Sequence, residues 1–135
     1  MENMYINYWA VLVAAVSSFI LGGLWYSPML FGKAWMKENG FTDKDLKKHS
    51  SLRKFGTSLI LSLIMALNLA AFLGDSKTDL TWGITAGSLA GIGWVATSIG
   101  IIGVFENKSW RYIMINAGYT IITFIAMGAI IGSWR

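Results

Sequence analysis

The chain lacks cysteine and has one proline and one histidine among its 135 residues. Without cysteine it forms no disulfide bond and offers no thiolate to a metal ion. The single histidine, His49, lies in a basic segment, so we expect no metal site and no cofactor. No nucleophile–base pair, phosphate-binding glycine loop or pair of catalytic carboxylates is visible in the sequence. We therefore expect that the protein is not an enzyme.

Charged residues are also scarce, at 13% of the chain, whereas apolar residues make up 55% and the mean hydropathy is +0.54. A soluble domain of this length needs more charge to cover its surface, so lipid is the expected solvent. Fifteen glycines beside one proline indicate close helix packing rather than a loop-rich fold. The sequence therefore predicts an all-α integral membrane protein in which residues 1–135 form a single domain.

Four apolar runs have the length of a membrane-spanning helix and contain no Asp, Glu, Lys, Arg or His. We predict transmembrane helices near residues 8–26, 55–73, 82–105 and 112–131. The first run follows a segment without Lys or Arg and ends in Trp-Tyr-Ser-Pro, so we interpret it as a retained helix rather than a cleaved signal. The absence of ionisable residues from these runs counts against a proton-coupled pump.

The first helix leaves the membrane through the stretch 22–35, which contains the only proline, Pro28. Proline lacks an N–H and disfavours helical geometry in the residue before it, so the first helix is expected to end there. Residues 29–38 are predicted to form a short interfacial helix that ends at Asn39-Gly40. Four of its side chains are expected at the lipid boundary: Met29, Leu30, Phe31 and Trp35.

Basic residues divide unequally between the two ends of the predicted bundle. The end that contains residues 33–54 has nine of them: Lys33, Lys37, Lys44, Lys47, Lys48, Arg53, Lys54, Lys108 and Arg111. The other end has only Lys77 and Arg135. By the positive-inside rule we expect a multi-pass protein of the cell (inner) membrane, with a cytoplasmic loop at 33–54 and both termini outside. The loop accounts for the net charge of +4, so no nucleic-acid partner is expected.

Small residues recur at every fourth position in two predicted helices and form two ladders. This spacing places them on one helix face, where they allow close approach of a partner helix. The first ladder is Ser58, Ser62, Ala66, Ala70 and Gly74, and the second is Gly83, Gly87 and Gly91. Besides contact with membrane lipids, we therefore expect a homo-oligomer. The short connections also predict that the second helix lies antiparallel to the third, and the third to the fourth.

Polar side chains occur within the predicted spans: Asn68, Trp94, Asn116, Tyr119, Thr120 and Thr123. Inside a membrane bundle such groups act more often as hydrogen bonds between helices than as ligands of a substrate. We expect that role for most of them. We also expect the indole N–H of Trp94, at mid-span, to find an acceptor.

Three segments resemble one bacterial membrane family, which is catalogued as a domain of unknown function, DUF1761. The first is Leu24-Trp25-Tyr26-Ser27-Pro28 followed by Leu30-Phe31-Gly32-Lys33-Ala34-Trp35. The others are Phe105-Glu106 with Ile115-Asn116-Ala117-Gly118-Tyr119, and the closing Met127-Gly128-Ala129-Ile130. The resemblance covers nearly the whole chain and implies a four-helix integral membrane domain. It implies no activity, substrate or catalytic residue.

The predicted topology brings six residues from distant parts of the chain to one cytoplasmic edge: Trp25, Tyr26, Glu106, Arg111, Asn116 and Tyr119. Our hypothesis is that they line a polar pocket under the Pro28 turn, and that an amphipathic lipid headgroup occupies it. The alternative is that they pair with one another and fix the point where the first helix leaves the membrane. For Glu106 we expect a structural role, either paired with Arg111 or Lys33 or capping the turn.

Three classes of function stay open at this point. The favoured class is a structural or lipid-interacting, self-associating membrane protein of unknown activity. The alternative is a small transporter or channel subunit, which the lack of a charged path disfavours. The least favoured class is a membrane enzyme with a cytoplasmic-edge site near Glu106, Arg111, Tyr26 and Asn116. A polar cavity that reaches past the membrane midplane favours transport, and a dry bundle favours the first class.

The orientation generates a direct prediction. Single variants Lys47→Cys and Lys77→Cys, made in this cysteine-free chain, place one thiol in each of the two loops. A membrane-impermeant maleimide applied to intact cells is expected to label position 77 and to spare position 47. Preferential labelling of position 47 contradicts the predicted orientation.

Overall fold

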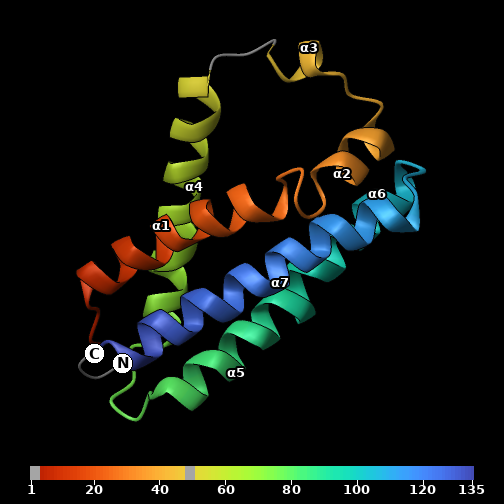
Figure 1. Cartoon of the computed structure of the whole chain (residues 1–135). Helices are drawn as coiled ribbons and strands as arrows, with labels where there is room; N and C mark the ends of the chain where they lie inside the picture. The colour runs from red at the N-terminus through yellow and green to blue at the C-terminus, as the bar shows by residue number, and fades with distance from the viewer. Residues whose placement is uncertain (1–3, 48–50) are drawn as a thin grey trace.

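The computed structural model describes residues 4–47 and 51–135, and all regular structure in these ranges is helical (Figure 1). Lys48, His49 and Ser50 lie outside the described residues. The elements in chain order are α1 (Tyr8–Trp25), α2 (Gly32–Asn39), α3 (Asp43–Leu46), α4 (Ser51–Phe72), α5 (Leu80–Ala90), the π-helix η1 (Gly91–Ala96), α6 (Thr97–Phe105) and α7 (Trp110–Ser133).

Among the described residues, four helices are long and apolar enough to cross a membrane, as the sequence predicts. They are α1, α4, α7 and the continuous helix Leu80–Phe105, called here the third span, which α5, η1 and α6 form together. The predicted bounds differ most at the helix starts. The third span begins at Leu80, where the Asp79 carboxylate accepts a bond from Trp82 N, and α7 begins at Trp110 behind the cap residue Ser109. These capping residues are polar, so hydropathy alone places the starts too late.

The third span contains a π-helical segment that the sequence pattern does not predict. In a π segment the backbone bonds shift, which leaves carbonyl groups to be satisfied by other donors. The hydroxyl of Thr97 donates to the carbonyl oxygens of Gly93 (2.8 Å) and Trp94 (3.1 Å), and the Ser98 hydroxyl also donates to Trp94. Side chains of the following turn thus stabilise the altered geometry of η1.

The chain turns sharply between α1 and α2, as Pro28 predicts. The turn is closed by backbone bonds from Phe31 N to the Trp25 carbonyl and from Gly32 N to the Ser27 carbonyl, both 2.9 Å. A Cβ at Gly32 would lie 2.7 Å from the Ser27 oxygen, so only glycine fits there. The helix α2 then ends at Gly40, whose φ of 68° suits glycine. The predicted short helix and its stop are therefore present, but the helix begins at Gly32 rather than at residue 29, because residues 28–31 form the turn.

One detail of α2 differs from the prediction. Met29, Leu30 and Phe31 are exposed, but Trp35 is not a lipid-facing residue. Its ring packs edge-on against the ring of Tyr26 at a centroid distance of 5.3 Å, and against Phe41 at 5.4 Å. The rotation of α2 about its axis decides this direction, and a helix of eight residues has too few turns for the sequence pattern to fix that rotation.

The helix α7 is the spine of the bundle, because it packs against the third span, α1 and α2. Its closest partner is the third span, so the predicted antiparallel pairing of these two helices is confirmed. The glycine ladder forms their seam: a Cβ at Gly83 would collide with the carbonyl oxygen of Gly128, and one at Gly87 with that of Phe124. A Cβ at Gly91 would approach Ile121 Cα to 3.1 Å.

The ladder of α4 packs against α1. The Ser18 hydroxyl donates to the Ser62 hydroxyl at 2.9 Å, and Ala66 and Ala70 are fully buried in the core beneath this bond. Gly74 is also buried, against Met4. Ser58 is exposed, so the ladder forms a seam along four of its five positions.

The prediction that α4 and the third span are antiparallel neighbours is wrong. The two helices meet near their connection, where the rings of Phe72 and Trp82 lie 6.4 Å apart, and they then diverge (Figure 1). The physical reason is that the small face of α4 is occupied by α1, which crosses it. A short loop fixes only the first turns of the helices that it joins.

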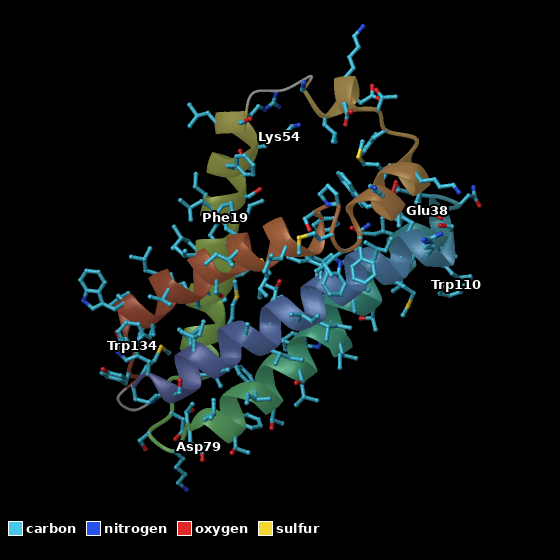
Figure 2. The ribbon with its side chains drawn as sticks, viewed as in Figure 1. Phe19, Glu38, Lys54, Asp79, Trp110 and Trp134 are labelled. Atoms are coloured by element: carbon cyan, nitrogen blue, oxygen red, sulfur yellow. The ribbon has the colours of Figure 1, made fainter. Side chains whose placement is uncertain are left out.

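The start of α1 and the C-terminus lie at the same end of the bundle, here called the terminal end, together with the turn between α4 and α5 (Figure 1). Hydrogen bonds join the three segments: Tyr5 N donates to the Gly74 carbonyl (3.1 Å), and the Arg135 guanidinium donates to the carbonyls of Leu73 and Asp75. Figure 2 shows Asp79 and Trp134 at this end, and Glu38 and Lys54 at the opposite one, here called the loop end.

The glycine seam generates a stability prediction. Gly87→Ala is expected to destabilise the fold by about 1–3 kcal/mol, because the added Cβ meets backbone that cannot rotate away. Gly100→Ala is the matched control in the same span, since a Cβ added there would meet nothing within 4 Å. The control is expected to be neutral or to gain up to about 1 kcal/mol of helix propensity. Thermal unfolding in detergent measures both, and equal stabilities would contradict the seam.

Candidate functional site

A pocket of about 480 Å³ opens at the loop end, beside the point where the chain leaves α1. We call it the exit pocket. It collects residues from four parts of the chain: the end of α1, α2 and the segment after it, α6, and the first half of α7. The residues that line it are Tyr26, Trp35, Asn39, Phe41, Ile99, Ile102, Gly103, Glu106, Tyr112, Asn116, Tyr119 and Thr120.

Four of the six residues predicted for this edge line the exit pocket: Tyr26, Glu106, Asn116 and Tyr119. They come from α1, α6 and α7, so the fold brings together groups that lie up to 93 residues apart in sequence. The central bond is the one from the Tyr26 hydroxyl to Asn116 Oδ1, at 2.6 Å.

Trp25 and Arg111 do not line the pocket. The Trp25 indole N–H donates to the Ile115 carbonyl at 2.8 Å, and its ring packs against that of Phe31 at 4.5 Å. A Cβ at Gly118 would approach the Trp25 ring to 2.8 Å, so glycine is needed where the indole crosses α7. Trp25 is therefore an anchor between α1 and α7. Arg111 is exposed on the first turn of α7 and lies outside the pocket lining.

The aromatic rings of the pocket are arranged at steep angles to one another. The ring of Tyr26 stands edge-on to Trp35 (65° between planes) and to Tyr119 (5.4 Å, 61°), and Trp35 stands edge-on to Phe41 (73°). Edge-to-face pairs are a favoured geometry of aromatic clusters. As a result, the ring planes that line the pocket are not parallel to one another. The Tyr119 hydroxyl donates to the Ser18 carbonyl at 3.0 Å and ties this wall to α1.

Of the two structural roles expected for Glu106, an ion pair or a cap of the turn, the structure shows the cap. Glu106 caps the C-terminal end of α6 through its backbone N–H, but its carboxylate makes no hydrogen bond or ion pair within residues 4–47 and 51–135. The contact between α2 and the turn before α7 is made instead by Glu38, which accepts a bond from the Ser109 hydroxyl at 2.6 Å. The predicted pairs of Glu106 with Arg111 and with Lys33 are therefore absent from this part of the chain.

Sequence reasoning missed Trp35, Asn39, Phe41 and Tyr112 as pocket residues. Trp35 and Asn39 are four positions apart on α2, and the Asn39 amide donates to the Trp35 carbonyl at 2.8 Å, so they share one helix face. This spacing was the available signal. Phe41 follows the end of α2 at Gly40, whose left-handed backbone changes the direction of the chain. The position of Phe41 therefore cannot be predicted from helical spacing.

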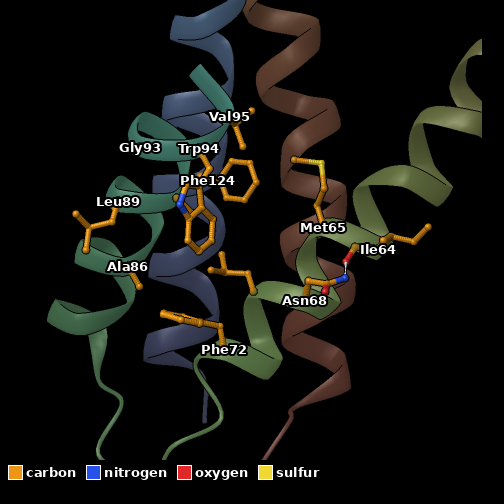
Figure 3. A pocket seen from close by; sticks show the side chains of 12 residues that line it. Ile64, Met65, Asn68, Phe72, Ala86, Leu89, Gly93, Trp94, Val95 and Phe124 are labelled. Atoms are coloured by element: carbon orange, nitrogen blue, oxygen red, sulfur yellow. Dashed lines mark hydrogen bonds between the residues drawn. The ribbon is translucent and has the colours of Figure 1, made fainter. Parts of the chain in front are cut away.

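A second cavity, of about 670 Å³, lies within the membrane-spanning part, between α4 and the third span (Figure 3). We call it the α4–η1 groove. In Figure 3, Trp94 and Phe124 lie on one side and Met65 and Asn68 on the other. Its remaining lining is apolar and comes from Ile64, Leu69, Phe72, Ala86, Leu89, Ala90, Gly93 and Val95.

The polar groups of the spans are only partly satisfied as predicted. Tyr119 and Asn116 do bond to other segments, whereas Asn68 donates to the Ile64 carbonyl of its own helix (2.8 Å). Trp94 is 70% exposed, and its indole N–H has no acceptor in the part of the chain that the structure describes. The expectation that this N–H finds an acceptor is therefore not met within the described residues and stays a prediction for a group outside them. The buried Thr123 hydroxyl also lacks a partner among the described residues.

Among the described residues, no group of three or more His, Asp or Glu side chains is placed to hold a metal ion. The sequence matches the profile of a family described as "Protein of unknown function (DUF1761)" over residues 9–132. No curated protein and no solved structure matches the chain. The profile spans both the Trp25-Tyr26 exit and the segment that carries Asn116 and Tyr119, so it covers the whole lining of the exit pocket.

Proposed function

We propose that this chain, which belongs to the DUF1761 family of unknown function, is a lipid-interacting membrane protein that holds the polar head of an amphiphile in the exit pocket. One observation carries the proposal: Tyr26, Glu106, Asn116 and Tyr119, from three helices, converge on one cavity at an end of the bundle. A pocket with aromatic walls and a few polar groups is the usual form of a small-molecule site.

The surroundings of the pocket suit a ligand that is polar at one end and apolar at the other. Ile99 and Ile102 line its lower wall, and Ile102 is 59% exposed on the outer surface of α6. An acyl chain that leaves the pocket past these residues stays in contact with apolar surface. Met29 and Leu30, exposed in the exit turn, add further apolar surface at the loop end.

A binding role is favoured over transport and over catalysis by the lack of charged side chains among the described residues below the exit pocket. There the core between α1, α4 and α7 is mostly apolar, with Ala14, Ala66 and Met127 among its buried side chains, and the buried polar groups that the structure describes in it are the hydroxyls of Ser18 and Thr123. Ion pathways through a membrane are usually marked by ionisable residues within the span. The pocket holds one carboxylate, Glu106, so it offers no acid–base pair of carboxylates.

We place the protein in the bacterial cell membrane with the loop end in the cytoplasm and both termini outside. Eight of the described basic residues support this side, against Lys77 and Arg135 at the terminal end: Lys33, Lys37, Lys44, Lys47, Arg53, Lys54, Lys108 and Arg111. The exit pocket then faces the cytoplasmic leaflet, whose headgroups lie at the depth of its opening.

The proposed site predicts the behaviour of a double variant, Tyr26→Phe with Asn116→Leu. Removing both partners of a partly buried hydrogen bond costs less stability than removing one, so the fold is expected to persist. Lipid that co-purifies with the protein in mild detergent is expected to be lost, as measured by native mass spectrometry. Asn68→Leu, the same exchange outside the pocket, is the control and is expected to retain the lipid.

Two results would contradict the proposal. If the double variant keeps its lipid at the wild-type level, the exit pocket is not the binding site. If it loses thermal stability by several degrees and lipid retention merely follows unfolding, these residues anchor α1 and the structural alternative holds.

A second proposal, self-association, is favoured by the α4–η1 groove. The third span and α4 are the least buried of the four spans, at 11% and 17%. Within the groove, the Trp94 N–H and the Asn68 amide oxygen have no hydrogen-bonding partner among the described residues. Acyl chains offer no hydrogen bond, whereas a second copy packed into the groove does. We propose that the protein forms homo-oligomers through this groove.

This proposal predicts that Asn68→Leu weakens the oligomer by roughly threefold to tenfold in dissociation constant, the range expected for one hydrogen bond between membrane helices. Dilution of fluorophore-labelled protein in liposomes, followed by energy transfer, measures the constant. The Tyr26→Phe/Asn116→Leu variant serves here as the control. A wild-type protein that stays monomeric at all lipid ratios would overturn the proposal, as would an unchanged constant in Asn68→Leu.

A further inference from the structure

The exit pocket combines aromatic walls with a single negative charge. Five of its lining residues are aromatic, and Glu106 is the one charged side chain among the described residues that line it. In the sequence-based hypothesis Arg111 is the positive charge of the pocket, but Arg111 lies outside the lining. The electrostatic character of the pocket is therefore the opposite of the one expected from the sequence.

Aromatic rings attract cations through the negative potential of their faces. The edge-to-face contacts of Tyr26 with Trp35 and Tyr119 leave ring faces turned in different directions around one space. One ring of the pocket already carries a cation: the Lys108 ammonium lies 5.1 Å from the centroid of Tyr112. The walls thus have the composition and the geometry of a site for an organic ammonium group.

The carboxylate at the rim adds the counter-charge. Glu106 is exposed and has no ion-pair partner in the described chain, although four basic residues lie at the same end: Lys33, Lys37, Lys108 and Arg111. A carboxylate next to desolvated aromatic surface gains more from a bound cation than one in open water. Asn39 and Asn116 contribute neutral amide groups, and among the described residues Lys108 is the one cation recorded against a ring of the lining, that of Tyr112.

We propose that the exit pocket selects a ligand with an ammonium head, held between the aromatic walls and the Glu106 carboxylate, with an apolar chain along Ile99 and Ile102. This inference rests on the proposed function and names the ligand class for that site. Two sources share this chemistry: an ammonium-bearing phospholipid, such as phosphatidylethanolamine, and a soluble organic amine.

The test compares lipids that differ in the headgroup alone. Delipidated full-length protein in mild detergent is titrated with phosphatidylethanolamine, phosphatidylcholine and phosphatidylglycerol of identical acyl chains, and binding is measured by native mass spectrometry. We expect the two ammonium lipids to bind about tenfold more tightly than phosphatidylglycerol. A basic surface without the pocket gives the reverse order, because it attracts the anionic lipid.

Variants of lining residues test whether the preference for ammonium lipids depends on the exit pocket. Glu106→Gln is expected to reduce the ammonium preference by about tenfold, and Trp35→Leu to reduce it while Trp35→Phe restores most of it. Asp43→Asn removes the same charge from the exposed α3 at the same end, outside the pocket lining, and is the matched control. The ratio of affinities is the readout, because a general loss of stability lowers binding of all three lipids alike.

The source of the ammonium group is separated by competition. Displacement of the bound lipid by millimolar choline or ethanolamine supports ammonium recognition by a pocket open to soluble amines. Competition by the lipids alone, with their ammonium preference intact, supports recognition of the headgroup on its lipid.

Equal binding of the three lipids, preference for phosphatidylglycerol, or an unchanged ratio in Glu106→Gln would overturn the inference. Equal binding that the Tyr26→Phe/Asn116→Leu variant abolishes leaves the proposed lipid site standing without its ammonium selectivity. If the wild-type protein retains no lipid, both the proposed lipid site and its ammonium selectivity are wrong.

Discussion

The close approach of the third span to α7 is the contact on which the rest of the structure depends. In lipid, burial of apolar surface between helices gains little, so association depends on backbone approach and on hydrogen bonds. Gly83, Gly87 and Gly128 allow that approach, because a Cβ at any of them would collide with the facing backbone. Locking two antiparallel helices along their length places the end of α6 beside the start of α7. Glu106 and Asn116 share one pocket for this reason.

A second anchor completes the exit pocket. The Trp25 indole N–H bonds to the Ile115 carbonyl and holds the end of α1 on α7, so that Tyr26 reaches Asn116. The turn closed at Gly32 then directs α2 back over the opening and brings Trp35 against Tyr26. The contacts that position these pocket residues therefore also hold the helices together.

The helix α4 has a different relation to the bundle. It is fixed through its small-residue face to α1, with the Ser18–Ser62 bond at the crossing, and leaves its other faces open. The π segment of the third span lies across the resulting groove and presents Trp94 to it. Polar groups without a partner inside a membrane span favour further association, and the groove presents two of them, on Trp94 and Asn68. On the proposals made above, the two cavities take different occupants: a headgroup at the end of the bundle, and a second copy along its side.

The sequence by itself determined the four spans, the exit at Pro28, the stop at Gly40 and the glycine seam. Each of these depends on residues that are contiguous or that recur at helical spacing. Only the tertiary structure decided that α4 packs on α1 rather than on α5, that Trp35 turns into the pocket while Arg111 stays outside, and that Glu106 lacks a partner in the described chain. Such features depend on how each helix is rotated about its axis and where helices cross. The packing of the whole chain sets those angles, because in lipid nearly every face of these helices is apolar and no single face is marked by its composition.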